Sequence, residues 1–359
     1  ETYNAWGAIR AAEHMQGGDA VMLRMYDALI SAQYKPPGGS PDDPFRLDHA
    51  RLLLQNGEVE RARSRLDGVV DPQSIMTIRI NRLYDPLRSD PAFEQRLDVS
   101  AAAEASIARA RRIKEEQPRR LSAVVGLARD LRDIGRSAEA LAEIDRVLPA
   151  AQAEDAASHF DDLGEQLHWL LSTKAELLYD LGRNDEARDF FGTSMSAGLD
   201  GSVNVNQTVD FAGMLNGEGR GADALQVLRT LSRLSVYGDM WLQSERACAA
   251  DQTGDRQTRD EALAALRAHE ADNAMALSHA LLCVNDVDGA AALMIRRLNN
   301  PKERESALVA LQRYHHVATR RMPREALELQ RLTQVRERPD VIAAAAAVGR
   351  IEDSPLFTY

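Results

Sequence analysis

The chain has 359 residues, of which 44% are hydrophobic and only 5% aromatic, and its formal net charge is -11. This length and apolar content suffice for a large buried interior, while the excess of acidic groups argues against a nucleic-acid partner held through phosphate contacts. No stretch approaches 18 consecutive apolar residues, so the sequence predicts no membrane span.

The first 44 residues form two predicted segments. Residues 1–33 contain helical patterns on both sides of Gly17 and Gly18, and they predict a degenerate N-terminal hairpin. Residues 34–44 carry four prolines and two glycines, which a helix does not tolerate, and predict a linker. Because the chain begins at Glu1 without a leader pattern, we expect an exported periplasmic or secreted bacterial protein, or a piece trimmed from a larger, cytoplasmic one.

Residues 45–300 carry a recurring pattern of turn residues and alanines. A turn residue recurs at Gly57, Gly135, Gly182, Gly219, Gly254 and Asn285. An alanine lies seven positions before or five positions after these anchors, at Ala50, Ala62, Ala128, Ala140, Ala175, Ala187, Ala212, Ala224, Ala247 and Ala290. Small residues on both sides of a tight turn let two antiparallel helices approach closely. The pattern predicts helical hairpins in tandem.

The segment Val124–Pro149 resembles a tetratricopeptide repeat. The matching positions are Val124, Leu127, Ala128 and Leu131 on the first helix and Ala140, Ile144 and Val147 on the second. With weaker copies, the resemblance covers about two thirds of the chain. It implies an all-α, right-handed α-α superhelix, a solenoid of antiparallel hairpins.

Two irregular inserts interrupt the predicted repeats, at residues 82–93 and 150–162. In the first, Asp-Pro steps predict extended or turn geometry at Asp85 and Asp90, with Leu87 and Phe93 packed on neighbouring helices. The second insert is expected to lengthen the second helix of one repeat or to add a loop on one face of the superhelix. Residues 301–359 predict a C-terminal helical cap, with helices that start at Pro301, Pro323 and Pro339.

The resemblance also implies which side chains face the concave surface, because the first helix of each repeat lines that surface. These candidate partner-binding residues are Arg129, Arg132, Trp169, Glu176, Tyr179, Asn206, Asn216, Trp241, Asp251 and His279. An indole that does not fill a core is a good anchor for a partner, so Trp169 and Trp241 matter most. The alternative for each residue is packing between repeats.

Two cysteines, Cys248 and Cys283, lie 35 residues apart, which is one repeat, on the first helices of adjacent hairpins. This spacing leaves a disulfide open, but we expect free buried thiols.

The sequence contains no H-E-x-x-H, G-x-x-x-x-G-K-[ST] or G-x-S-x-G motif. We therefore expect no catalysis, no cofactor and no metal, and predict a scaffold that binds a protein or peptide on its concave face. Two alternatives stay open: the sensor arm of a larger regulator whose output domain is absent, and an enzyme with a site in the concave groove. The enzyme would require a buried cluster of titratable groups with perturbed pKa values.

Overall fold

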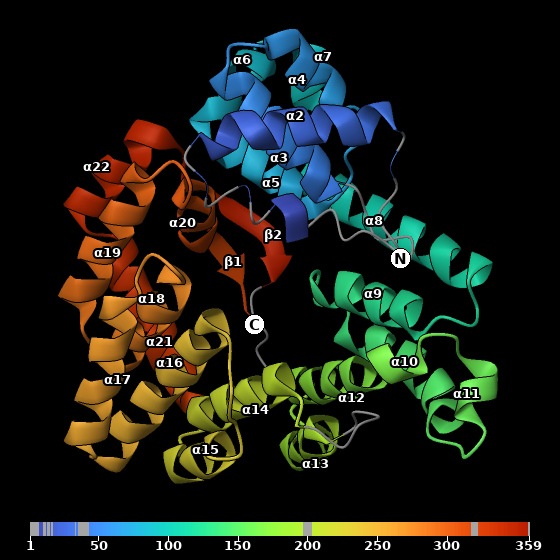
Figure 1. Cartoon of the computed structure of the whole chain (residues 1–359), viewed down its shortest axis with the longest axis vertical. Coiled ribbons are helices and arrows are strands. Elements are labelled where there is room, and N and C mark those ends of the chain that lie inside the picture. The colour runs from blue at the N-terminus through green and yellow to red at the C-terminus, as the bar shows by residue number, and fades with distance from the viewer. Residues whose placement is uncertain are drawn as a thin grey trace. The chain divides into compact units, whose positions relative to one another are not determined.

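The computed structural model describes residues 7–9, 12, 15, 17–32, 34, 43–196, 203–316 and 322–357. Most of the predicted linker 34–44, and residues 1–6 of the predicted N-terminal hairpin, lie outside them. The described chain is predominantly helical, which confirms the all-α prediction at that level (Figure 1). None of its described helices has both the length and the apolar character needed to cross a bilayer.

The chain divides into two compact units. Unit 1 comprises Glu1–Ser106 with Val348–Glu352, and unit 2 comprises Ile107–Ala347 with Asp353–Tyr359. Unit 1 contains α2 (Gly18–Ser31), α3 (Asp43–Gln55), α4 (Val59–Arg65), α5 (Pro72–Ile80), the 3-10 helix η2 (Arg82–Tyr84), α6 (Asp85–Arg88), α7 (Pro91–Gln95) and the start of α8 (Val99–Glu116). Its α2–α3 core includes Met22, Tyr26, Phe45 and Leu52.

The first predicted insert becomes η2, α6 and α7 in unit 1. Leu87 and Phe93 are buried there, as predicted. Asp90 is extended and its carboxylate accepts a hydrogen bond from the Ala92 amide at 2.9 Å, so it caps α7. The expectation of non-helical geometry at Asp85 is wrong, because Asp85 is helical and begins α6. A proline in the first helical turn is tolerated because no intrahelical donor is required there.

Unit 2 is a series of helices, most of which pack on a neighbour in sequence. The helices are α9 (Leu121–Arg132), α10 (Ser137–Ala151), α11 (Ala156–His159), α12 (Leu163–Asp180), α13 (Asn184–Met195), α14 (Val205–Gly217), α15 (Gly221–Leu228), α16 (Val236–Thr253), α17 (Arg256–Ala268), α18 (Ala274–Cys283), α19 (Val287–Asn299), α20 (Arg304–Ala310), α21 (Pro323–Arg336) and α22 (Pro339–Val348). Five contacting pairs, α9–α10 through α18–α19, follow one another from green to orange in Figure 1. The first helices α9, α12, α14, α16 and α18 also contact one another in that order.

The turns between paired helices share one backbone geometry. The six predicted anchors all have positive φ, between 64° at Asn285 and 85° at Gly219. In the turn at Gly135, the Gly135 amide donates to the Arg132 carbonyl and the Arg136 amide donates to the Leu131 carbonyl. This is the Schellman arrangement, which satisfies the carbonyls at a helix end. All ten flanking alanines are at most 2% exposed, as close helix approach requires.

A short parallel sheet joins the C-terminal residues to unit 2. Strands β1 (Arg313–His315) and β2 (Asp353–Phe357) pair with each other. The Phe357 amide donates to the Asp133 carbonyl at 2.8 Å, and the Phe357 ring lies over Gly135, where a Cβ atom would be only 2.7 Å away. Strand β2 therefore docks through Phe357 on the α9–α10 turn.

Candidate binding cavity

A cavity of about 680 Å³ lies among the first helices of unit 2. Helices α12, α14, α16 and α18 contribute most of one wall, and α21 closes another, in line with its contacts to α14, α18 and α19. The lining includes the carboxylates of Glu176, Asp210, Glu245, Glu325 and Glu328, the rings of Trp169, Phe191, Tyr237 and Trp241, and the cationic groups Arg132 and His279. We call this site the acidic cavity.

The candidate residues from sequence mostly gather at the acidic cavity. Its lining includes Arg132, Trp169, Glu176, Asn206, Asn216, Trp241 and His279. Arg129 lies beside it, with its guanidinium 5.1 Å from the centre of the Trp169 ring. Tyr179 is only 1% exposed and packs in the core, while Asp251 is paired with Arg259 at 3.4 Å. That any of these ten candidate residues binds a partner stays a prediction.

Arg132 is held by two carboxylates on α12. Its Nε donates to Asp180 Oδ2 at 2.8 Å, and it also pairs with Glu176. The Asp180 carboxylate is fully buried and accepts a second hydrogen bond from Ser137 Oγ at 3.0 Å. Because Asp180 and Glu176 neutralise the guanidinium, Arg132 adds little positive charge to the cavity.

A second polar network connects α14, α16, α18 and α21. Asn216 Nδ2 donates to Glu245 Oε2 at 2.8 Å, and the Glu245 carboxylate lies 3.5 Å from His279 Nδ1. His279 Nδ1 also contacts Ser244 Oγ at 3.0 Å, and His279 Nε2 lies 3.2 Å from Glu328 Oε2. Burial alone lowers the pKa of His279, but Glu245 and Glu328 raise it to about 9. The raised pKa favours the protonated form of His279 at neutral pH, while burial also raises the pKa of Glu245.

Asp210, in the cavity wall, has a pKa well above the usual value of an aspartate. Asp210 is exposed to solvent at the cavity wall, so water screens the charges around it. Desolvation, together with Glu176 and Glu245, raises the pKa of Asp210 to about 7, and Arg129 opposes this increase. Crowded carboxylates that repel each other favour a bound cation, because a cation relieves the repulsion.

Sequence reasoning missed Asp210, Glu245 and Glu328. The first two had a usable signal, because Asn206 and Asp210, like Trp241 and Glu245, are four positions apart on one helix and share a face. Glu328 had no such signal in the sequence. It reaches the cavity because α21 packs back on the first helices. Arg331 anchors α21 there by donating to the carbonyls of Leu282 and Cys283 at the end of α18.

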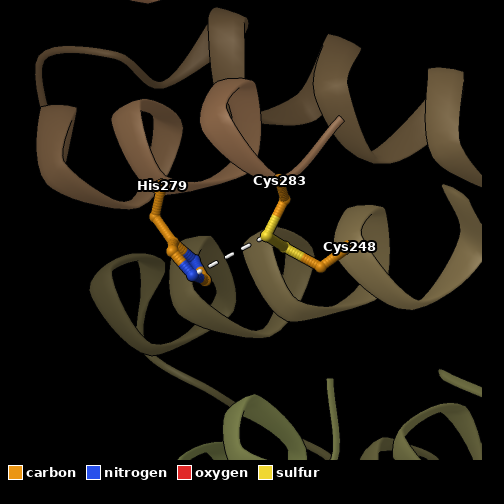
Figure 2. A group of neighbouring side chains, drawn as sticks. All are labelled: Cys248, His279 and Cys283. Carbon is orange, nitrogen blue, oxygen red and sulfur yellow. Dashed lines mark hydrogen bonds between the residues drawn. A yellow bond between two sulfur atoms is a disulfide. The ribbon is translucent and has the colours of Figure 1, made fainter. Parts of the chain in front are cut away.

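The expectation of free cysteines is wrong. Cys248 on α16 and Cys283 on α18 form a disulfide, with their Cα atoms 5.2 Å apart. Helices α16 and α18 pack directly on each other, which brings the two cysteines close in space although they lie 35 residues apart in sequence. Figure 2 shows the His279 ring beside this disulfide, 3.7 Å from Cys283 Sγ through its Nε2.

No protein-family model matches the chain, and no curated protein matches it either.

Proposed function

We propose that unit 2 is a right-handed, tetratricopeptide-type solenoid that binds a basic segment of a protein or peptide in the acidic cavity. The repeated hairpins support the solenoid, because their turns share one geometry and their first helices contact each other in sequence order. The observation that carries the binding function is the gathering of five carboxylates and two indole rings around one cavity.

The chemistry of the lining favours a lysine or arginine side chain over an anionic one. Indole faces attract cations within about 6 Å, and the attraction strengthens when water is excluded. The lining carboxylates add Coulomb attraction and outnumber the cations Arg132 and His279, which are themselves paired with acids. An extended basic segment would place one cation in the cavity and its backbone along the first helices.

The binding test compares two labelled decapeptides by fluorescence anisotropy, one of alternating lysine and alanine and one with glutamate for lysine. We expect the lysine peptide to bind more tightly, with an affinity that falls as salt increases. Asp210→Asn combined with Trp241→Ala should weaken binding at least tenfold.

Two controls accompany this test. Glu154→Gln removes an exposed acid outside the cavity and should leave affinity unchanged. Trp241→Phe keeps an aromatic face and should retain part of the affinity, which guards against misfolding of the alanine variant. Equal binding of both peptides, or no loss in a folded cavity variant, contradicts the proposal.

One observation favours a second candidate, acid–base catalysis in the same cavity. Asp210 combines a pKa of about 7 with access to the cavity, which suits a general acid or base. This candidate requires a substrate that the protein converts at a rate lost in Asp210→Asn. A panel of peptide and glycoside substrates, analysed by mass spectrometry with both proteins, tests it, and equal rates in both would exclude it.

A further inference from the structure

We propose that Cys248, Cys283, His279 and Glu328 form a Zn²⁺ site once the Cys248–Cys283 disulfide is reduced. The sulfur atoms and a His279 ring nitrogen all lie within 4.8 Å of one another. Glu328 is the fourth ligand in this proposal: its Oε1 lies 3.1 Å from Cys283 Sγ and its Oε2 lies 3.2 Å from His279 Nε2. The site shares His279 and Glu328 with the lining of the acidic cavity, but it does not rest on the proposed basic partner, because its ligands are side chains of this chain alone.

The distances fit four ligands around one metal. Tetrahedral Zn²⁺ with bonds of about 2.3 Å to sulfur and about 2.0 Å to nitrogen or oxygen places neighbouring ligand atoms roughly 3.2 to 3.8 Å apart. The observed separations from His279 Nε2 are 3.7 Å to Cys283 Sγ and 3.2 Å to Glu328 Oε2, already within that range. The two sulfurs, bonded to each other in the disulfide, must move apart, and the Cys283 sulfur must also move slightly away from Glu328 Oε1, which lies 3.1 Å from it.

The ligand types select zinc over hard cations. Two thiolates and an imidazole are soft or borderline ligands, which Ca²⁺ and Mg²⁺ do not prefer. The surroundings also orient the imidazole as a ligand. His279 Nδ1 contacts Ser244 Oγ at 3.0 Å, while Nε2 points toward Cys283, as Figure 2 shows. A hydrogen bond at one ring nitrogen is the usual way to hold the other one toward a metal.

The conversion is balanced with a dithiol as reductant. The dithiol transfers two electrons and two protons, so that the S–S bond breaks, two protein thiols form and the reductant becomes a cyclic disulfide. Zn²⁺ then binds the two sulfurs as thiolates and the His279 ring as neutral imidazole, which releases the two thiol protons and the proton that His279 holds at neutral pH to solvent. The metal would tie α21, through Glu328, to α16 and α18, so the redox state would control how firmly α21 closes the acidic cavity.

The experiment measures zinc binding to the full chain in both redox states. The protein is reduced with dithiothreitol, desalted without oxygen, and titrated with Zn²⁺ against a chromophoric indicator. We expect one Zn²⁺ per reduced chain with submicromolar affinity, and none at the same concentrations in the oxidised chain. Co²⁺ in place of Zn²⁺ should give the intense absorption of a tetrahedral site with thiolate ligands.

Variants then identify the ligands. Cys283→Ser should abolish the tight site, and Glu328→Gln should weaken it at least tenfold while leaving the cysteines in place. His269→Gln is the matched control, because His269 is exposed and lies outside the site, paired with Asp272 at 2.9 Å. Far-UV circular dichroism monitors folding. The proposal is overturned if the folded, reduced chain binds no Zn²⁺ tightly, if Cys283→Ser binds as well as wild type, or if reduction unfolds unit 2 and Zn²⁺ does not restore it.

Discussion

Reduction of the Cys248–Cys283 disulfide should destabilise unit 2 substantially. The bond closes a loop whose ends are 35 residues apart in sequence. In the chain-entropy account, a loop of this length lowers the entropy of the unfolded chain by about 13 cal/mol/K, which corresponds to about 4 kcal/mol at 25 °C. We therefore expect reduction in the presence of EDTA to lower the free energy of unfolding by about that amount.

Urea unfolding followed by tryptophan fluorescence measures this change. In a Trp6→Phe background the two remaining tryptophans, Trp169 and Trp241, both belong to unit 2, so the signal reports on that unit. The double variant Cys248→Ala/Cys283→Ala should fall slightly below the reduced protein, because it also loses the packing of two buried sulfurs.

The reasoning would be refuted by a loss below about 1 kcal/mol with an unchanged dependence on urea. Such a result would mean that helix packing already restrains the two cysteines in the unfolded ensemble. In a separate measurement, Zn²⁺ added to the reduced protein without EDTA should raise the free energy of unfolding, because a metal that binds only the folded chain stabilises it by mass action.

Three further predictions concern a turn, a buried histidine and a buried ion pair. Gly135→Ala should lower the free energy of unfolding of unit 2, measured in urea, by more than Gly254→Ala does. Both glycines have φ near 75°, where an alanine costs about 1 to 2 kcal/mol, but only at Gly135 would the new Cβ atom meet the Phe357 ring. Equal losses in the two variants would contradict this contact. Desolvation lowers the pKa of His49 to about 4, so its contribution to stability is present above pH 6.5 and lost as the pH falls toward 4. Between pH 7 and pH 5 the free energy of unfolding of the wild type should fall by about 2 kcal/mol more than that of His49→Gln. Identical urea midpoints for the two proteins at both pH values would exclude this contribution of His49. Arg132→Ala should reduce the free energy of unfolding by about 3 kcal/mol, because it leaves the fully buried Asp180 carboxylate without its guanidinium partner, and a loss under about 1 kcal/mol would argue that Ser137 suffices.

Local features of the sequence were enough to predict the helices and their turns. The backbone geometry of a Schellman turn depends on a few consecutive residues, so Gly135 and its counterparts could be located by spacing alone. Alanines such as Ala128 and Ala140 were predictable for the same reason, since close contact between paired helices excludes larger side chains at those offsets.

The gathering of seven candidate residues at one cavity followed from the same periodicity. Residues at equivalent positions of successive first helices face the same side when the helices pack in register. Asp251 and Tyr179 do not line the cavity, although the periodicity predicted that they would. Asp251 forms an ion pair with Arg259, and Tyr179 packs in the hydrophobic core.

The remaining features depend on long-range packing, which no short sequence pattern encodes. Glu328 reaches the acidic cavity because α21 packs back on α14 and α18, and the disulfide forms because α16 and α18 bring Cys248 and Cys283 within 5.2 Å at their Cα atoms. The geometry of a turn depends on a few consecutive residues, so it can be predicted from the sequence. The return of a distant helix depends instead on the total free energy of many weak contacts, and these exist only once the chain has folded.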